Sequence, residues 1–231
     1  MRALLCLTLC AIASAQLIPN VQLSDALIGL LAQNSKIATS NAAITPCTDS
    51  LLNHCQYSFN SGAQIDTSFN YKSGTAFYNT VNSLLNGNLT EILQICDQRT
   101  QFYLCLGTTY YSCLSLYSVV GRNGVTYQNG YDYVRTYMGL EFLCNSGFEE
   151  VVNAFDCLSG IPESQKYKDC INAFNETINP ASLCSTVDST GRCLYNVYSS
   201  KCNGKDAGFY GCENFRTTFD QSCYGLRCIV Q

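Results

Sequence analysis

Cysteine is the residue type in this chain whose number and spacing could support chemistry. The sequence contains 16 cysteines but a single histidine. Cys193 and Cys202 lie nine positions apart in the aromatic stretch "RCLYNVYSSKCNG", and Cys223 and Cys228 form a closer pair. Cysteines can ligate a metal ion, act as thiolate nucleophiles or form disulfides, and their spacing helps to separate these roles.

Metal ligation is disfavoured by the spacing. A zinc site usually combines cysteines about two to four residues apart with histidine, because a tetrahedral ion needs ligands about 2.0–2.3 Å away on a tight turn. Beyond residue 15, only Cys223-x₄-Cys228 comes near this pattern. We therefore expect no metal site and no other cofactor.

Candidate catalytic groups are also scarce. His54 is the only histidine and lies beside Cys55, and general-base catalysis needs a positioned partner and a nucleophile as well. Glu149 and Glu150 are adjacent in a first helical turn, where they point in different directions and favour the helix dipole. The sequence contains no Gly-rich phosphate loop, G-x-S-x-G or H-E-x-x-H motif. We predict a protein that is not an enzyme.

The first residues predict secretion. The chain begins "MRALLCLTLCAIASAQ", with one positive charge at Arg2, an apolar run and the small-x-small triplet that ends at Ala15. This is the pattern of a signal peptide over residues 1–15, which leaves a mature chain from Gln16. The apolar run is too short for a membrane span, which needs about 20 residues. The uncharged stretch "FYLCLGTTYYSCLSLYSVVG" is interpreted as a buried helix, so we expect no membrane span.

Loss of the signal peptide removes Cys6 and Cys10, and the remaining even number of cysteines favours complete pairing in disulfides. On a helix, Cys193 and Cys202 would lie about 13 Å apart, whereas a disulfide needs Cα atoms within about 7 Å. Each must therefore bond another segment, and the same holds for Cys105 and Cys113. The pairing stays open among Cys47, Cys55, Cys96, Cys105, Cys113, Cys144, Cys157, Cys170, Cys184, Cys193, Cys202, Cys212, Cys223 and Cys228.

Helical signals dominate the chain and predict an all-α, disulfide-stapled domain. In "IPESQKYKDCINAFNETINP", apolar residues recur at helical spacing before Pro180. We expect at least five helices between Ser73 and Cys228, in a core domain over 75–231. Residues 16–74 are predicted to add an N-terminal helix, a hairpin-like segment with Cys47 and Cys55, and a Ser/Asn/Gly-rich loop over 56–76.

An internal duplication is suggested by two runs of cysteines. Cys96-x₈-Cys105-x₇-Cys113 is similar in spacing to Cys184-x₈-Cys193-x₈-Cys202, and each run follows Ile or Leu.

Two features point to the surface. The stretch over 121–133 contains two Asn-Gly pairs, which favour tight turns. It predicts a small hairpin or loop that presents Tyr127, Tyr131 and Tyr133 as a candidate binding surface, with a plain connection between helices as the alternative. Asn88 in "NLT" and Asn175 in "NET" are expected to carry N-linked glycans.

The charge content excludes one large class of partners. Charged residues make up 13% of the sequence, and the formal net charge is −4 at pH 7. There is no basic cluster to neutralise phosphates, so we expect no nucleic-acid partner.

The cysteine pattern between residues 96 and 228 resembles that of secreted cysteine-rich proteins of nematodes. The stretches that carry the resemblance are "LQICDQRTQFYLCLGTTYYSC", "LEFLCNSGFEEVVNAFDCL" and "SLCSTVDSTGRCLYNVYSSKCNGKDAGFYGC". In particular, they are similar to the domain named for chondroitin proteoglycans of the egg surface and to related uncharacterised secreted families. The resemblance implies an extracellular, matrix-associated helical domain. The chain has no acidic Ser-Gly cluster, which argues against a role as a chondroitin carrier.

Taken together, these patterns predict a secreted, N-glycosylated, non-catalytic protein that acts by binding or structural association outside the cell. The expected partner is an extracellular protein, a glycan or a small apolar ligand. One alternative is a carrier that encloses an apolar ligand between stapled helices. A second alternative is a cryptic hydrolase whose catalytic site has no recognisable motif.

Overall fold

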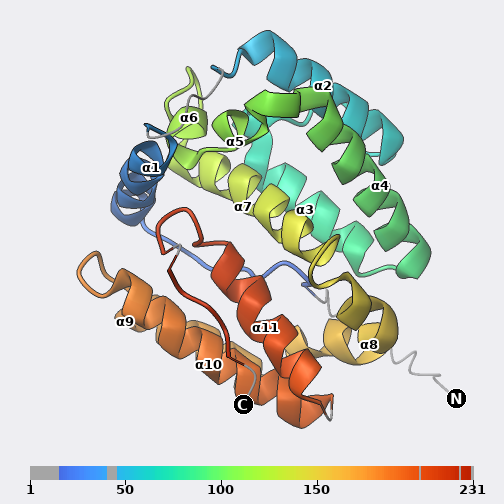
Figure 1. Cartoon of the computed structure of the whole chain (residues 1–231), viewed down its shortest axis with the longest axis vertical. Coiled ribbons are helices and arrows are strands. Elements are labelled where there is room, and N and C mark those ends of the chain that lie inside the picture. Colours follow the sequence, from blue (N-terminus) through green and yellow to red (C-terminus); the bar gives the residue numbers. More distant parts are fainter. Residues whose placement is uncertain (1–15, 41–45, 203, 224, 230–231) are drawn as a thin grey trace, which may run out of the picture.

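The chain folds as an all-α protein (Figure 1). The structure, a computed structural model, describes residues 16–40, 46–202, 204–223 and 225–229, so the expected signal peptide lies outside the described residues. The α-helices are α1 (Asp25–Ser40), α2 (Asp49–Gly62), α3 (Gly74–Leu85), α4 (Leu89–Leu106), α5 (Tyr110–Cys113), α6 (Leu116–Val120), α7 (Tyr127–Leu143), α8 (Phe148–Gly160), α9 (Gln165–Thr177), α10 (Leu183–Lys201) and α11 (Lys205–Thr217). Single 3₁₀ turns are η1 (Tyr71–Ser73), η2 (Gly107–Thr109) and η3 (Ile161–Glu163). Within these ranges there is no strand, and the predicted fold class is confirmed.

Local sequence explains where several helices begin. An N-cap side chain accepts a hydrogen bond from an otherwise unpaired backbone N–H of the first turn. Thr48 does this for α2, Asn88 for α4, Thr126 for α7 and Ser164 for α9. In α9, the apolar stripe read from the sequence is the face that is buried, so its periodicity is confirmed.

Seven disulfides divide the fold into two covalent modules. The bridges Cys47–Cys113, Cys55–Cys105 and Cys96–Cys144 lie within residues 47–144, which we call the N-terminal module. The bridges Cys157–Cys202, Cys170–Cys193, Cys184–Cys223 and Cys212–Cys228 lie within residues 157–228, the C-terminal module. No bridge among these joins one module to the other, so apart from the chain between residues 144 and 157 the modules are held together by non-covalent contacts.

Both modules use the same order of pairing. In the N-terminal module, the first cysteine pairs with the fifth, the second with the fourth and the third with the sixth. The C-terminal module repeats this order when the additional Cys212–Cys228 bridge is set aside. In each case a long helix, α4 or α10, carries the third and fourth cysteines. Because six cysteines allow many pairings, the shared order supports the internal duplication.

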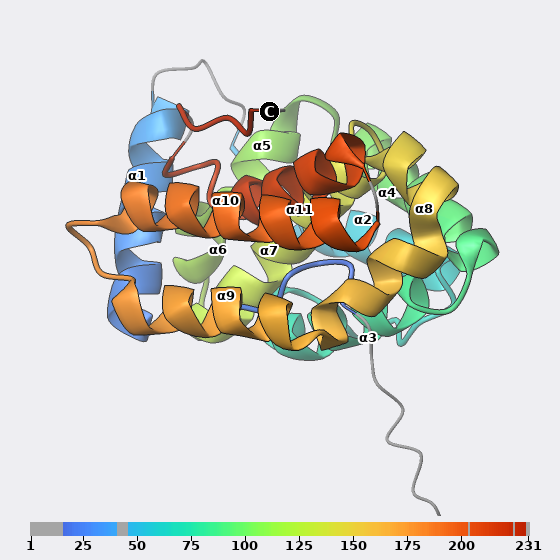
Figure 2. The same cartoon turned by 90° about the horizontal axis from the view of Figure 1, so that it is seen from below.

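The modules pack over one hydrophobic core that also includes the N-terminal residues. Figure 1 shows α2 to α7 on one side and α8 to α11 on the other, and the segment before α1, drawn in blue, runs between the two groups. Figure 2 shows the same segment from below, near α7 and α9. Leu17, Ile18 and Val21 in this segment are fully buried. The N-terminal part is therefore a core element and not an addition to a core that starts at residue 75.

The predicted organisation of residues 47–76 needs correction. Cys47 and Cys55 do not form a hairpin-like pair, because each bonds a cysteine beyond residue 100. The expected loop over 56–76 is also shorter, since α2 continues to Gly62 and η1 and α3 follow. Phe59 is buried on the same face of α2 as Cys55. Burial of this apolar face favours the helix through the Ser- and Asn-rich sequence.

Candidate functional site

The structure brings all fourteen predicted cysteines into disulfides. The Cα–Cα distances lie between 4.9 Å for Cys47–Cys113 and 6.0 Å for Cys212–Cys228, within the range of normal bridges. Cys193 bonds Cys170 and Cys202 bonds Cys157, so the predicted links between helices are confirmed. No thiol of this set is left to act as a nucleophile.

The candidate Tyr-rich surface is wrong for two of its three residues. Thr126 caps α7, which begins at Tyr127, so the second Asn-Gly pair lies inside the helix. Tyr131 is 2% exposed and Tyr133 is 0% exposed, whereas Tyr127 is half-exposed. The Tyr133 hydroxyl donates a 2.6 Å hydrogen bond to Gln56 Oε1. Burial of these rings between α7 and its neighbours outweighs the turn preference of Asn-Gly.

The two glycosylation motifs lie at exposed positions. Asn88 is the exposed N-cap of α4, and its Oδ1 accepts a hydrogen bond from the Glu91 N–H at 3.1 Å. Asn175 is exposed near the end of α9. Glycosylation at both residues stays a prediction.

The polar residues considered for catalysis are not gathered at one place. His54 lies on the exposed side of α2, whereas Glu149 and Glu150 lie in the first turn of α8. Figure 1 shows α2 and α8 in different groups of helices. In the part of the chain that the structure describes, no group of three or more His, Cys, Asp or Glu residues could hold a metal ion.

The candidate site is a cleft of about 450 Å³ between the two modules. One wall comes from the N-terminal module and the residues just after it, and the other comes from α11 and the turn that follows. The cleft is lined by Tyr111, Met138, Glu141, Phe142, Asn145, Ser146, Phe209, Glu213, Arg216, Thr217, Asp220 and Gln221. Its volume falls within the usual range for small-ligand sites, about 300–1,000 Å³.

The N-terminal wall combines aromatic surface with a partly exposed carboxylate. The Tyr111 side chain is 58% exposed. Partial burial of the ring, and then the nearby Glu141 carboxylate, raise the pKa of Tyr111 above that of a free tyrosine. Glu141 Oε2 is held by the Tyr110 hydroxyl at 3.1 Å and by Arg99 Nη2 at 3.4 Å. Asn145 Nδ2 donates to the Glu141 carbonyl at 2.7 Å, which fixes the rim.

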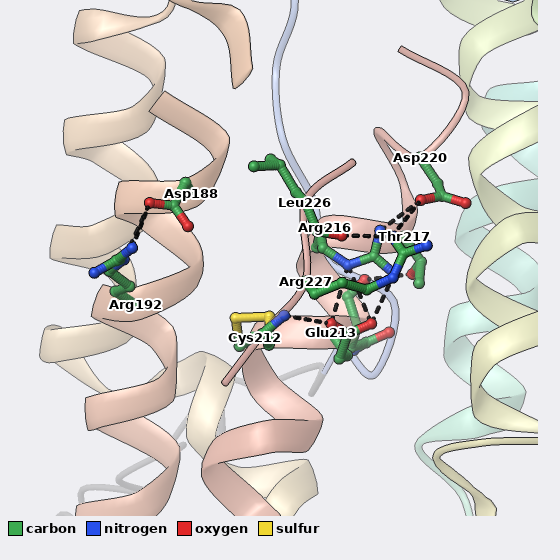
Figure 3. The surroundings of a disulfide bond; sticks show 11 residues. Asp188, Arg192, Cys212, Glu213, Arg216, Thr217, Asp220, Leu226 and Arg227 are labelled. Atoms are coloured by element: carbon green, nitrogen blue, oxygen red, sulfur yellow. Dashed lines mark hydrogen bonds and ion pairs between the residues drawn. A yellow bond between two sulfur atoms is a disulfide. The ribbon is translucent and has the colours of Figure 1, made fainter. Parts of the chain in front are cut away.

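The C-terminal wall is a network of charges on α11 and the turn that follows it (Figure 3). Arg216 donates to Glu213 through Nε at 3.0 Å and Nη2 at 2.7 Å, and through Nη1 to Asp220 at 2.5 Å. Burial acts to lower the pKa of Arg216, but its hydrogen bonds to Glu213 and Asp220 outweigh that effect and raise it. The guanidinium of Arg216 therefore keeps its positive charge in this wall.

The same network anchors the C-terminal residues. The backbone N–H of Cys228 donates to Glu213 Oε1 at 2.8 Å, next to the Cys212–Cys228 bridge. Figure 3 shows Arg216 with Glu213 and Asp220 beside this bridge, while Asp188 and Arg192 pair separately on α10. The charged wall is thus held by a disulfide on one side and by α11 on the other.

Sequence reasoning missed the cleft because its residues are far apart in the chain. Tyr111, Glu141 and Asp220 come together only through the packing of α5, α7 and the turn after α11. None of them belongs to a recognisable motif.

The arrangement suits a ligand that has both an apolar face and hydroxyl groups. Tyrosine offers a large, rigid contact area with a polar tip. Carboxylate and amide oxygens on the rim can accept hydrogen bonds from hydroxyl groups. By contrast, the apolar space between Leu31, Leu116 and Val134 is only about 20 Å³, close to the room that one water molecule needs.

Comparisons with known proteins give no match: no family model, no curated protein and no solved structure is similar to this chain. The resemblance to nematode secreted proteins therefore stays a prediction. Among the helices that the structure describes, none combines the length and apolar character that crossing a membrane requires.

Proposed function

We propose that this is a secreted, N-glycosylated, non-catalytic protein that binds a glycan in the cleft between its two disulfide modules. The cleft supports this best, because an exposed aromatic ring lines about 450 Å³ together with carboxylate and amide groups. The seven disulfides fit an oxidising environment outside the cytosol. The bridges also make each wall rigid, which lowers the entropy lost on binding.

The two alternatives have less support. An apolar carrier needs an enclosed cavity, and the apolar space of about 20 Å³ described above is too small for a lipid. A hydrolase needs a nucleophile and a base within hydrogen-bond reach, and His54 and the bridged cysteines do not supply such a pair.

Replacing Tyr111 by alanine is expected to weaken glycan binding about tenfold, because an exposed aromatic ring in the cleft offers a large, rigid contact area. The measurement is binding of the native secreted protein to a glycan array, followed by titration with the best glycan. Tyr57→Ala is a matched control, since Tyr57 on α2 is 57% exposed and lies outside the cleft. Equal binding by Tyr111→Ala and Tyr57→Ala would place the site elsewhere. Absence of any bound glycan would reject the proposed ligand.

Glycosylation is tested best at the threonines of the two motifs. Asn88 caps α4, so its replacement would damage the helix as well as the motif. Thr90→Ala and Thr177→Ala remove the motifs and keep both asparagines. We expect each change to lower the mass of the secreted protein by one glycan, measured before and after enzymatic deglycosylation. Unchanged masses for both variants would show that neither asparagine is modified.

A further inference from the structure

The residues that precede α1 occupy a groove between the two modules. Leu17, Ile18 and Val21 are each 0% exposed although they belong to no helix. In Figures 1 and 2 this segment, drawn in blue, passes between α7 of the N-terminal module and the helices of the C-terminal module. A short non-helical segment is rarely the most buried part of a fold, since its backbone groups need partners.

Side chains of α3 bind the backbone of this segment from the N-terminal module. Asn82 Oδ1 accepts from the Ile18 N–H at 3.0 Å, and Asn82 Nδ2 donates to the Ile18 carbonyl at 3.3 Å. The Tyr78 hydroxyl donates to the same carbonyl at 2.9 Å. Ile18 is thus bound through both of its backbone groups.

Side chains of α7 and α11 complete the recognition from both modules. Arg135 Nη1 donates to the carbonyls of Pro19 at 3.3 Å and Val21 at 3.2 Å. Arg135 Nη2 donates to Asn20 Oδ1 at 3.2 Å. From the C-terminal module, Asn214 Nδ2 donates to the Leu17 carbonyl. The backbone carbonyls of residues 17, 18, 19 and 21 therefore all have side-chain donors.

Arg135 is held in place by its own module. Its guanidinium forms a 2.8 Å ion pair with Asp132 and lies 3.8 Å from the centre of the Tyr78 ring. Asp132 is fixed in turn by the Thr75 hydroxyl at 2.6 Å and by Gln128 Nε2 at 2.9 Å. The site is therefore built by contacts that do not involve the segment, as expected of a preformed binding site.

The shape of the groove matches the segment closely. A Cβ atom at Gly139 would lie 2.8 Å from Ile18 Cγ2, so only glycine leaves room for that side chain. Asn214 Oδ1 is buried and has no hydrogen-bond partner, so the groove keeps an unused acceptor beside the Leu17 carbonyl. Such an acceptor is available to a further N–H donor of a bound peptide.

We propose that this groove is a binding site for a short apolar peptide, and that residues 17–21 are its resident ligand and act as a latch between the modules. No disulfide joins the modules, whereas the latch contacts α3 and α7 on one side and α11 on the other. The same α7 and α11 line the cleft on another face. Docking of the latch therefore sets the distance between the cleft walls.

The test cuts the peptide bond between the latch and the rest of the chain after the protein has folded. A protease recognition sequence is inserted between Gln22 and Leu23, and the full-length secreted protein is folded, oxidised and only then cut. We expect the cut segment to stay bound during size-exclusion chromatography. Exchange with a fluorescent peptide of sequence QLIPNVQ then gives the release rate.

Variants define the residues that hold the latch. Loss of one neutral hydrogen bond should speed release about fivefold in Asn214→Ala. Arg135→Lys should speed it more than tenfold, because lysine cannot contact several acceptors through one planar fork. Arg99→Lys is the matched control, since Arg99 is also buried against two tyrosine rings but lies away from the groove. Equal release rates for Arg135→Lys and Arg99→Lys would overturn the assignment.

A separate measurement tests whether residues 17–21 hold the two modules together as a latch. After the segment has been removed by exchange and dilution, small-angle X-ray scattering should show a larger radius of gyration, and added QLIPNVQ should reverse it. Immediate loss of the segment with an unchanged scattering profile would overturn the proposal. In the uncut protein, Arg135→Lys should also increase hydrogen–deuterium exchange over residues 17–21 and α11, and Arg99→Lys should not.

Discussion

Arg135→Ala is expected to lower the free energy of unfolding by about 3–5 kcal/mol, because it leaves the Asp132 carboxylate buried without its charged partner. Both side chains are almost inaccessible, and their contact distance is 2.8 Å. The substitution also removes the donors for the carbonyls of Pro19 and Val21. Urea unfolding with the disulfides intact gives the measurement, as a shift of the midpoint at constant slope.

A matched variant separates this effect from the general loss of a buried arginine. Arg99 is nearly as buried as Arg135, but the side chain of its partner Glu141 is 32% exposed. Water can therefore solvate Glu141 when Arg99 is replaced, and Arg99→Ala should cost clearly less than Arg135→Ala. A double variant Arg135→Ala with Asp132→Asn should regain part of the lost stability, since no unpaired charge then remains. Equal destabilisation by Arg99→Ala and Arg135→Ala would contradict a special role of the buried pair.

The local rules of the sequence predicted the helices and the use of the cysteines. The spacing of Cys193 and Cys202 already excluded a bond between them, and the structure places them on α10 and at its end. The apolar stripe of α9 was visible because it follows helical periodicity. These predictions depend only on residues close together in the chain.

The partners of the cysteines could not be predicted, because spacing alone fits many pairings. Tyr131 and Tyr133 were misplaced because an Asn-Gly pair favours a turn, while Thr126 and the packing of α7 favour a helix. The cleft and the groove depend on contacts between distant segments. Asn214 lies 197 positions from Leu17, and no sequence pattern relates the two.

The disulfide order adds a physical reason for a two-part fold. Each module closes its own loops, the longest of which joins Cys47 to Cys113 across 66 positions, and such closure lowers the entropy of the unfolded module. Stabilisation of this kind acts within each module and not between them. The contact between modules must therefore come from packing and from buried polar groups such as Arg135 and Asn214.

The interior of both modules is unusually rich in tyrosine, which makes the fold sensitive to high pH. Burial raises the pKa of a group of tyrosines, and neighbouring groups contribute less to the shift. The group consists of Tyr78, Tyr110, Tyr131, Tyr133, Tyr137, Tyr167, Tyr198 and Tyr210. For Tyr78 the pKa rises from 10.0 to about 12. At a pH where these phenols have lost their protons in the unfolded chain, they are still protonated in the folded protein.

The sign of the pH dependence follows from the proton balance. Above pH 10 the folded protein binds more protons than the unfolded chain, so the free energy of unfolding falls as pH rises. One pKa unit corresponds to about 1.4 kcal/mol, so the Tyr78 shift alone removes on the order of 2–3 kcal/mol between pH 10 and 12. The stability is complete below pH 10 and is lost as pH rises through the folded pKa values.

We therefore expect the free energy of unfolding to fall steeply as pH rises above 10. Ultraviolet absorbance of the phenolate should rise in two stages, and the second stage, from the buried group, should coincide with loss of near-ultraviolet circular dichroism. Tyr78→Phe should delay the second stage to higher pH, because it removes one titrating group and keeps the ring against Arg135. It also removes the hydrogen bond to Ile18, so the variant should be less stable at neutral pH. A single reversible titration of all 16 tyrosines near pH 10 would contradict the buried arrangement.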